Sequence, residues 1–243
     1  MSAPEADVPA VPTTSDTVTE LPCEALLFDM DGTLIDSAAS IERAWAAFAR
    51  EEGLPVDAVL AALPGRTAVD ILADFLPGPR AVAAGAERVR RMQRDHVRDV
   101  RPLPGARDLL TGLPAGRWAV VTAAYEEVAR ARLAAAGLPV PPVLIAADSV
   151  RRGKPDPEGY ERGARALGVA PQACVVFEDA DVGVRAGRAA GARCVGVGGA
   201  VTHPEVAARV ADLRGIRVTA TATGLLLRVP VSAHAATADG GPR

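Results

Sequence analysis

The sequence predicts an α/β fold: a parallel β-sheet covered by helices, with a helical domain inserted after the first strand. Short apolar runs rich in Val, Leu and Ile alternate with helical patterns, which favours a parallel sheet with helices on both faces. The runs are apolar at nearly every position, as expected for strands buried on both sides. From residue 37 to about residue 101 only helical patterns occur, a stretch too long for a simple crossover connection.

The apolar runs define the expected strands, and Pro and Gly residues define the ends of the expected helices. The strands are Ala25–Phe28, Trp118–Thr122, Val143–Ala147, Cys174–Glu178 and Cys194–Gly198, with Ile216–Ala220 as a possible sixth. The helices of the sheet domain are Ala106–Leu110, Glu126–Ala136, Pro157–Leu167 and Asp181–Ala190.

The inserted segment is expected to be a small helical cap over the sheet. Its first part, "SIERAWAAFAREEG", places Ile41, Trp45 and Phe48 at helical spacing. We therefore divide the chain into a core of residues 21–36 and 102–228 and a cap of residues 37–101. Residues 1–20 and 229–243 are rich in small and polar residues and are expected to be disordered tails.

Composition excludes several classes of protein. The 243 residues carry a net charge of −3 with acids and bases mixed, so no basic stripe for nucleic acid is present. The apolar segments are shorter than the ~20 residues that span a bilayer, and the first residues lack the features of a secretory signal. The three cysteines have no CxxC spacing and read as buried thiols. We expect a cytoplasmic monomer that binds neither membranes nor nucleic acid.

Residues with reactive side chains follow four of the expected strands, where an open parallel sheet forms its ligand crevice. They are Asp29, Asp31, Thr122, Lys154, Glu178 and Asp179. Several carboxylates share a small dry site only if a cation compensates them. Ligands that are all oxygen favour a hard ion such as Mg²⁺. Acids, a metal and a lysine together suit a dianionic phosphate.

Four motifs resemble those of the haloacid dehalogenase superfamily. The stretch "FDMDGTLIDS" resembles its first motif in the phosphatase form, and "VVTAAY", "GKPDP" and "VVFEDADVGVRAGRAAG" resemble its second, third and fourth motifs in order. The resemblance runs from about Ala25 to Val218. The helical insertion is similar to caps of the β-phosphoglucomutase-like and sugar or polyol phosphatase branch. The resemblance implies a Rossmann-like core with a helical cap.

The resemblance also implies roles for the two aspartates of the first motif. Asp29 would attack phosphorus and form an aspartyl-phosphate, which divides one hard displacement into two easier ones. Asp31 would protonate the leaving alkoxide and then deprotonate the attacking water. Met30 stands between them, and residues two apart in extended chain point to the same side.

The remaining motifs supply the phosphate and metal ligands that the resemblance implies. Thr122, with backbone N–H groups near Ala123, would hold phosphate oxygens, although Ser or Asn is common where Ala123 stands. Lys154 would neutralise the nucleophile and the phosphate, and Arg66 of the cap would reach the substrate. Mg²⁺ would be held by Asp29, by the backbone carbonyl of Asp31 and by Asp179, with Glu178 as a further ligand or as a partner of one.

Simpler readings compete with each assignment. The Asp-x-Asp-Gly stretch could be a plain turn, Thr122 an ordinary strand-end hydroxyl, and Lys154 or Arg66 a solvated side chain. Glu178 and Asp179 could be an acidic pair at a helix N-terminus. Four motifs in order favour a Mg²⁺-dependent phosphatase acting on a small phosphorylated metabolite, a sugar or polyol phosphate.

Other functions of the same fold are open alternatives. A β-phosphoglucomutase-like sugar phosphomutase would share every motif. A dehalogenase is disfavoured, because a departing halide gives the proton shuttle Asp31 nothing to protonate. A non-catalytic binding domain would be expected to lack one of the four groups, and none is missing.

Overall fold

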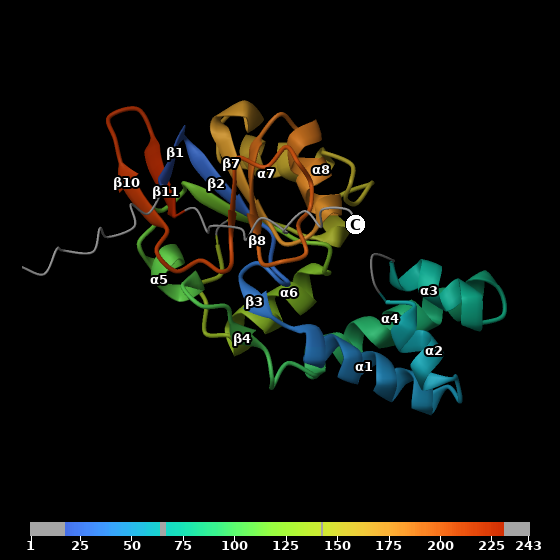
Figure 1. Cartoon of the computed structure of the whole chain (residues 1–243). Helices are drawn as coiled ribbons and strands as arrows, with labels where there is room; N and C mark the ends of the chain where they lie inside the picture. Colours follow the sequence, from blue (N-terminus) through green and yellow to red (C-terminus); the bar gives the residue numbers. More distant parts are fainter. Residues whose placement is uncertain (1–17, 64–66, 142, 231–243) are drawn as a thin grey trace, which may run out of the picture.

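The computed structural model describes residues 18–63, 67–141 and 143–230. A six-stranded sheet with the order β6-β5-β2-β7-β8-β9 forms its centre (Figure 1). In that order the strands are Leu144–Ile145, Trp118–Val121, Ala25–Phe28, Cys174–Glu178, Arg193–Val197 and Ala208–Val210. All neighbouring pairs run parallel. The α/β class predicted from the sequence is confirmed.

Strand β2 explains why the apolar runs are continuous. Its side chains alternate between two cores, with Leu26 and Phe28 on one face of the sheet and Ala25 and Leu27 on the other. Helices α5 and α6 cover the first face, and α7 and α8 cover the second. These helices are Ala106–Thr111, Glu126–Ala135, Glu158–Ala166 and Asp181–Ala189.

The four helices agree with the sequence-based prediction to within one residue at each end. Two short 3₁₀ helices, Ala147–Ser149 (η1) and Pro171–Ala173 (η2), were not predicted. Each is a single turn without a periodic pattern, so the sequence carries no signal for it. In the described part of the chain, no helix combines the length and apolarity needed to cross a membrane.

A second, antiparallel sheet of order β1-β11-β10 packs on the face that carries α5 and α6. Its strands are Val18–Cys23, Leu225–Pro230 and Arg217–Ala220. The possible sixth strand Ile216–Ala220 is therefore a strand, but its assignment to the parallel sheet is wrong. The sixth parallel strand is β9, whose sequence "ARV" is too short to stand out.

The pairing of β1 with β11 shows that the residues of both expected tails nearest the core lie in strands. Residues 18–20 and 229–230 lie in these strands, because β1 and β11 pair along their whole length. Alternating burial in β1, with one face of the strand on the core, gave no continuous apolar run to detect. The rest of both tails lies outside the described residues.

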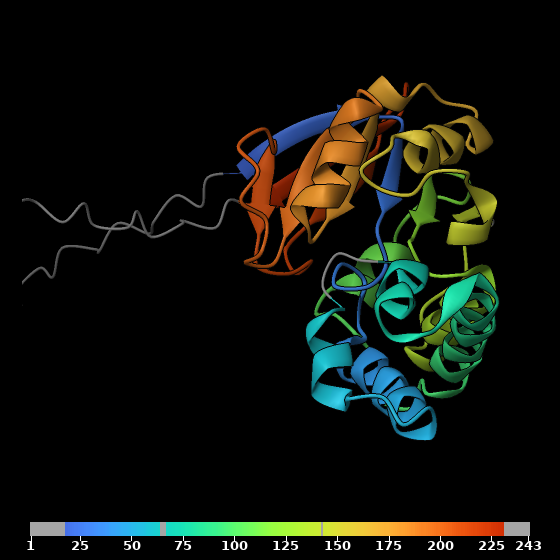
Figure 2. The same cartoon turned by 90° about the vertical axis from the view of Figure 1, so that its right-hand side faces the viewer.

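The inserted segment forms four helices that pack around their own core, apart from the sheet (Figures 1 and 2). They are α1 Ala38–Glu51, α2 Val56–Ala61, α3 Ala68–Phe75 and α4 Gly78–Asp95. Trp45 and Phe48 of α1 lie in that core, as their spacing predicted. The two connections pair with each other as the short strands β3, Ile35–Asp36, and β4, Arg101–Pro102. An inserted helical domain is confirmed, and its boundaries at residues 37 and 101 stay predictions.

The sheet core should be sensitive to truncation at Phe177. Its ring stacks on Phe28 with centroids 4.9 Å apart, and both side chains are fully buried. Phe177→Ala should lower the free energy of unfolding by about 3–5 kcal/mol, measured by urea denaturation. The control Val69→Ala alters a side chain in α3 that is 49% exposed, and should change it by less than about 0.5 kcal/mol. Equal losses in the two variants would contradict this picture of the core.

Candidate active site

Three neighbouring strands bring the predicted site residues to one edge of the sheet. Strand β2 lies between β5 and β7, so Asp29, Thr122 and Glu178 come from adjacent strand ends. Asp179 follows Glu178, and Lys154 comes from the segment between η1 and α7. The backbone N–H of Asp29 donates to the carbonyl of Phe177, which extends the pairing of β2 and β7 to the site. The topology therefore places these residues together.

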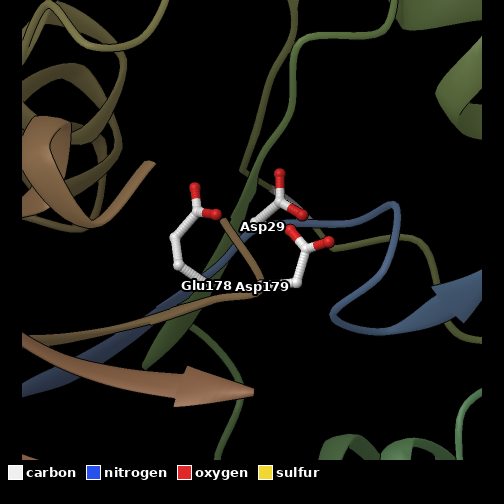
Figure 3. A group of neighbouring side chains, drawn as sticks. All are labelled: Asp29, Glu178 and Asp179. Atoms are coloured by element: carbon white, nitrogen blue, oxygen red, sulfur yellow. The ribbon is translucent and has the colours of Figure 1, made fainter. Parts of the chain in front are cut away.

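Asp29, Glu178 and Asp179 form a compact acidic cluster. One carboxylate oxygen from each residue lies within 4.8 Å of the others. Figure 3 shows the carboxylates of Asp29 and Asp179 turned toward each other, with Glu178 alongside. Asp29 is 7% exposed and Glu178 only 1%. So many negative charges in a buried place require positive charge close by.

Lys154 supplies part of that positive charge. Its Nζ donates to Asp29 Oδ1 at 2.6 Å and to Glu178 Oε1 at 2.5 Å. Burial disfavours the ammonium, but the charges of Asp29 and Glu178 outweigh this and raise the pKa of Lys154 above its usual value. Lys154 therefore stays charged, and one ammonium faces the three carboxylates of the cluster.

Glu178 is held by two donors on one oxygen. The hydroxyl of Tyr160, on α7, donates to Oε1 at 2.5 Å, beside the bond from Lys154. Burial, reinforced by the charge of Glu178, raises the pKa of Tyr160 well above its usual value, so the hydroxyl keeps its proton. The carboxylate also lies where a Cβ at position 183 would stand, which only Gly183 allows. Oε2 is left as the oxygen that could face a cation.

Asp29 differs from Glu178, because one of its oxygens is free. Oδ1 is bonded to Lys154, whereas Oδ2 is buried and has no hydrogen-bond partner among the described residues. Burial raises the pKa of Asp29 well above its usual value, with Glu178 and Asp179 adding to the rise and Lys154 opposing it. A further positive charge beside the carboxylate would favour its ionised form.

The donor set fits a hard divalent cation. The cluster contains only carboxylate oxygens, which suit Mg²⁺, Ca²⁺ or Mn²⁺ rather than a softer metal. Burial, together with Glu178, raises the pKa of Asp179 to about 6, so this carboxylate also gains from a cation. The carboxylates of Asp29 and the neighbouring Asp179 are the natural ligands.

Gly32 determines where Asp179 can lie. It has a φ of 86°, a left-handed conformation in which side chains are strained. A Cβ there would stand 2.0 Å from Asp179 Oδ2. The glycine of the first motif thus permits both the turn after β2 and the close approach of a carboxylate from the end of β7.

Asp31 does not point its carboxylate into the cluster. Oδ1 accepts from Ser37 Oγ at 2.6 Å, and both oxygens accept from Nη1 of Arg132 at 3.0 Å. Ser37 precedes α1, and Arg132 lies on α6. The expected acid–base role of Asp31, and its carbonyl as a metal ligand, stay predictions.

The expected phosphate and substrate ligands are only partly described. Thr122 is buried, and its Oγ1 accepts from the backbone N–H of Ala124 at 3.0 Å, which leaves the hydroxyl proton free to donate. Ala123 is exposed in the same turn. Arg66 of the cap lies outside the described residues, so its substrate role stays a prediction.

Three residues that contact the site, Tyr160, Ser37 and Arg132, were not predicted from the sequence. Tyr160 and Arg132 sit on helices of mixed composition, where residue type alone does not reveal which side chain turns toward the site. Ser37 is the last residue of the first-motif stretch, and its closeness to Asp31 in the sequence was a usable signal.

Comparison of the sequence with models of protein families identifies the family to which this fold and site belong. The model of the haloacid dehalogenase-like hydrolases matches residues 23–191. The chain belongs to that family. The resemblance found in the four sequence motifs is thereby confirmed, and the protein is an enzyme of the hydrolase class.

Named relatives of this haloacid dehalogenase-like hydrolase are phosphatases. It is 42% identical over 191 residues to hexitol phosphatase A of Escherichia coli, covering 76% of this chain and 87% of the relative. It is 39% identical over 184 residues to the fructose-1-phosphate phosphatase YqaB of the same species, covering 71% and 95%. Among solved structures, CbbY from Rhodobacter sphaeroides in complex with phosphate matches with a TM-score of 0.69 at 25% identity, covering 79% of this chain and 96% of that one.

The close approach at Gly32 gives a prediction for this family member. Gly32→Ala should displace Asp179 and lower the hydrolysis of p-nitrophenyl phosphate by about 10²-fold, since a misplacement of about 1 Å can cost that much. Gly116→Ala is the matched control, because Gly116 has a φ of 77° but open space around its Cβ position. Both variants should lose about 1–2 kcal/mol of stability from backbone strain. If Gly116→Ala loses as much activity as Gly32→Ala, strain and not displacement of Asp179 is the cause.

Proposed function

We propose that this protein is a Mg²⁺-dependent phosphatase that hydrolyses a sugar or polyol phosphate through an aspartyl-phosphate on Asp29. The observation that carries the proposal is the state of the Asp29 carboxylate. One oxygen is bonded to Lys154, and the other is buried without a hydrogen-bond partner in the described part of the chain. A nucleophile needs such a free oxygen, and a structural carboxylate would be fully bonded.

In the first step, Asp29 Oδ2 forms a bond to phosphorus as the bond to the leaving oxygen breaks. Asp31 gives its proton to that oxygen, so the substrate leaves as an alcohol. Lys154 holds Asp29 Oδ1 and fixes the direction of the free oxygen. Burial of Asp29 limits the access of water before the substrate binds.

In the second step, water attacks phosphorus and the bond to Asp29 breaks. Asp31 takes a proton from the water, and inorganic phosphate leaves. Asp29 returns to its carboxylate form, paired again with Lys154. Thr122 is available in both steps to donate its hydroxyl proton to a phosphate oxygen, because its own oxygen already accepts from Ala124.

Asp29 and Asp179 would hold the Mg²⁺, with the backbone carbonyl of Asp31 and Oε2 of Glu178 as further ligands. The ion would supply positive charge to the oxygens of the transferring group, which for phosphoryl transfer is a large part of catalysis. Lys154 supplies a fixed positive charge at Asp29 Oδ1, which leaves Oδ2 for the attack on phosphorus.

The class of substrate rests on the relatives and on the inserted helical domain. Both named E. coli relatives act on phosphates of six-carbon polyols or sugars by their names. A cap over the crevice would exclude water and select the alcohol part of the substrate. Arg66 is the proposed cap contact. The setting proposed from the sequence, a cytoplasmic monomer without a nucleic-acid partner, stays a prediction.

A substrate panel tests the proposal. Phosphate release should be fastest from sorbitol 6-phosphate, fructose 1-phosphate or a related polyol or sugar phosphate, and slow from nucleoside monophosphates. Asp29→Asn should lower the rate by about 10³-fold or more. Asp57→Asn, an exposed residue of α2, should leave it unchanged. Transfer of the group to a second hydroxyl of the same sugar, without release of phosphate, would show a mutase instead.

Removal of divalent metal should abolish activity. A chelator should stop turnover, and Mg²⁺ should restore it, because the acidic cluster keeps an uncompensated negative charge without a cation. Mg²⁺ should also raise the melting temperature of the wild-type protein and have a much smaller effect on Asp179→Asn. Undiminished turnover in the chelator would contradict the assigned cofactor.

A further inference from the structure

Arg132 is a buried charge that the mechanism above does not use. It lies on α6, and its side chain is 2% exposed. The other arginines of the described residues are exposed or half-exposed, as is Arg130, two residues earlier on the same helix and paired with Glu126. A buried guanidinium requires a carboxylate partner, and Arg132 contacts that of Asp31.

The two oxygens of Asp31 are not equivalent. Oδ1 accepts from both Ser37 Oγ and Arg132 Nη1, whereas Oδ2 accepts from Arg132 Nη1 alone. Oδ1 thus has two donors and Oδ2 has one, so Oδ2 keeps an acceptor position that Oδ1 does not. The side chain of Asp31 is 24% exposed, so one part of it faces open space. Oδ2 can therefore take a proton, or meet a substrate oxygen, without displacing either donor from Oδ1.

Arg132 also contacts the inserted helical domain. Its Nη2 donates to Oε1 of Gln93, on α4, at 3.0 Å. Helices α4 and α6 lie side by side, as Figure 2 shows. Further contacts join them, since Glu127 of α6 pairs with Arg90 and Arg94 of α4. One guanidinium therefore connects Asp31 to the position of a cap helix.

We propose that Arg132 is a positioning residue for Asp31: it holds the carboxylate through both oxygens, leaves an acceptor position open on Oδ2, and is itself oriented by Gln93 of the helical domain. The inference rests on the acid–base role of Asp31 in the proposed function. Arg132 touches neither substrate nor metal, and acts through Asp31. The helical domain thereby takes part in proton transfer as well as in substrate selection.

The proposal predicts an effect that depends on the leaving group. An alkoxide leaves poorly unless it is protonated, so a sugar or polyol phosphate needs a well-placed acid. Nitrophenolate leaves readily without a proton. The constant kcat/KM covers the steps up to formation of the aspartyl-phosphate, so it is independent of the later attack by water. The ratio of kcat/KM for the two substrates therefore reports on the acid alone.

The test compares sorbitol 6-phosphate with p-nitrophenyl phosphate. Arg132→Met should lower kcat/KM for sorbitol 6-phosphate about tenfold or more beyond any loss with p-nitrophenyl phosphate. Arg132→Lys should recover part of the difference, because it restores a charge but cannot also reach Gln93. Gln93→Leu should produce the same pattern more weakly. Arg130→Met is the matched control on the same helix and should leave the ratio unchanged.

A double-mutant cycle separates positioning from a structural role. In an Asp31→Asn background, Arg132→Met should have no further effect on the ratio, because the residue it positions no longer acts as an acid. Equal losses for both substrates would overturn the proposal. If Arg132→Met does not fold, as judged by circular dichroism, Arg132→Lys and Gln93→Leu carry the same test.

The same measurements distinguish failure of this inference from failure of the proposed function. A normal ratio in Asp31→Asn would show that Asp31 is not the acid, and the proposed mechanism would be wrong. A lowered ratio in Asp31→Asn with a normal ratio in Arg132→Met, Arg132→Lys and Gln93→Leu would overturn the role of Arg132 alone.

Discussion

The Lys154 ammonium is the charge on which the rest of the site depends, because it lies between two carboxylates that are almost completely buried. Without it, Asp29 and Glu178 would face each other uncompensated, and breaking a buried ion pair of this kind costs about 3–5 kcal/mol. Tyr160 donates a hydrogen bond to Glu178, and Gly183 leaves space for its carboxylate. Glu178 in turn accepts from Lys154 and so holds the ammonium in place. The arrangement keeps one oxygen of Asp29 bonded and the other free. It also leaves a net negative charge, which a divalent cation would compensate.

The sequence predicted the parts of this site that follow from topology. Asp29, Lys154 and Asp179 could be placed together because strand ends meet at one edge of a parallel sheet, whatever the details of packing. The four core helices were predictable from their caps. Contacts made by helical side chains were not, since Arg130 and Arg132 look alike in the sequence, yet one is at the surface and the other is buried against Asp31. Strands β1 and β11 were not predicted, because they pair with each other across about 200 residues of sequence. No local sequence pattern indicates such a contact.

The helical domain is connected to Asp31 by two routes. It begins directly after the first motif, so Ser37 bonds to Asp31 from the connection itself. The segments that lead into and out of the helical domain pair with each other as β3 and β4, so both lie together between the two domains. Through Gln93 and Arg132, helix α4 is also connected to this aspartate. Asp31 is therefore held by Ser37 and Arg132, which both connect it to the helical domain. Asp29 is held by Lys154, which Glu178 also binds.

Direct detection of a phosphorylated Asp29 is the sharpest measurement of the central claim. The Asp31→Asn variant lacks the base for attack by water, so it should accumulate the intermediate when mixed with p-nitrophenyl phosphate and Mg²⁺. Acid quenching and peptide mapping by mass spectrometry should then locate a phosphoryl group on the peptide that contains Asp29, and none in the variant that also carries Asp29→Asn. A phosphoryl group on another residue, or none at all while the wild-type enzyme turns over, would contradict the account.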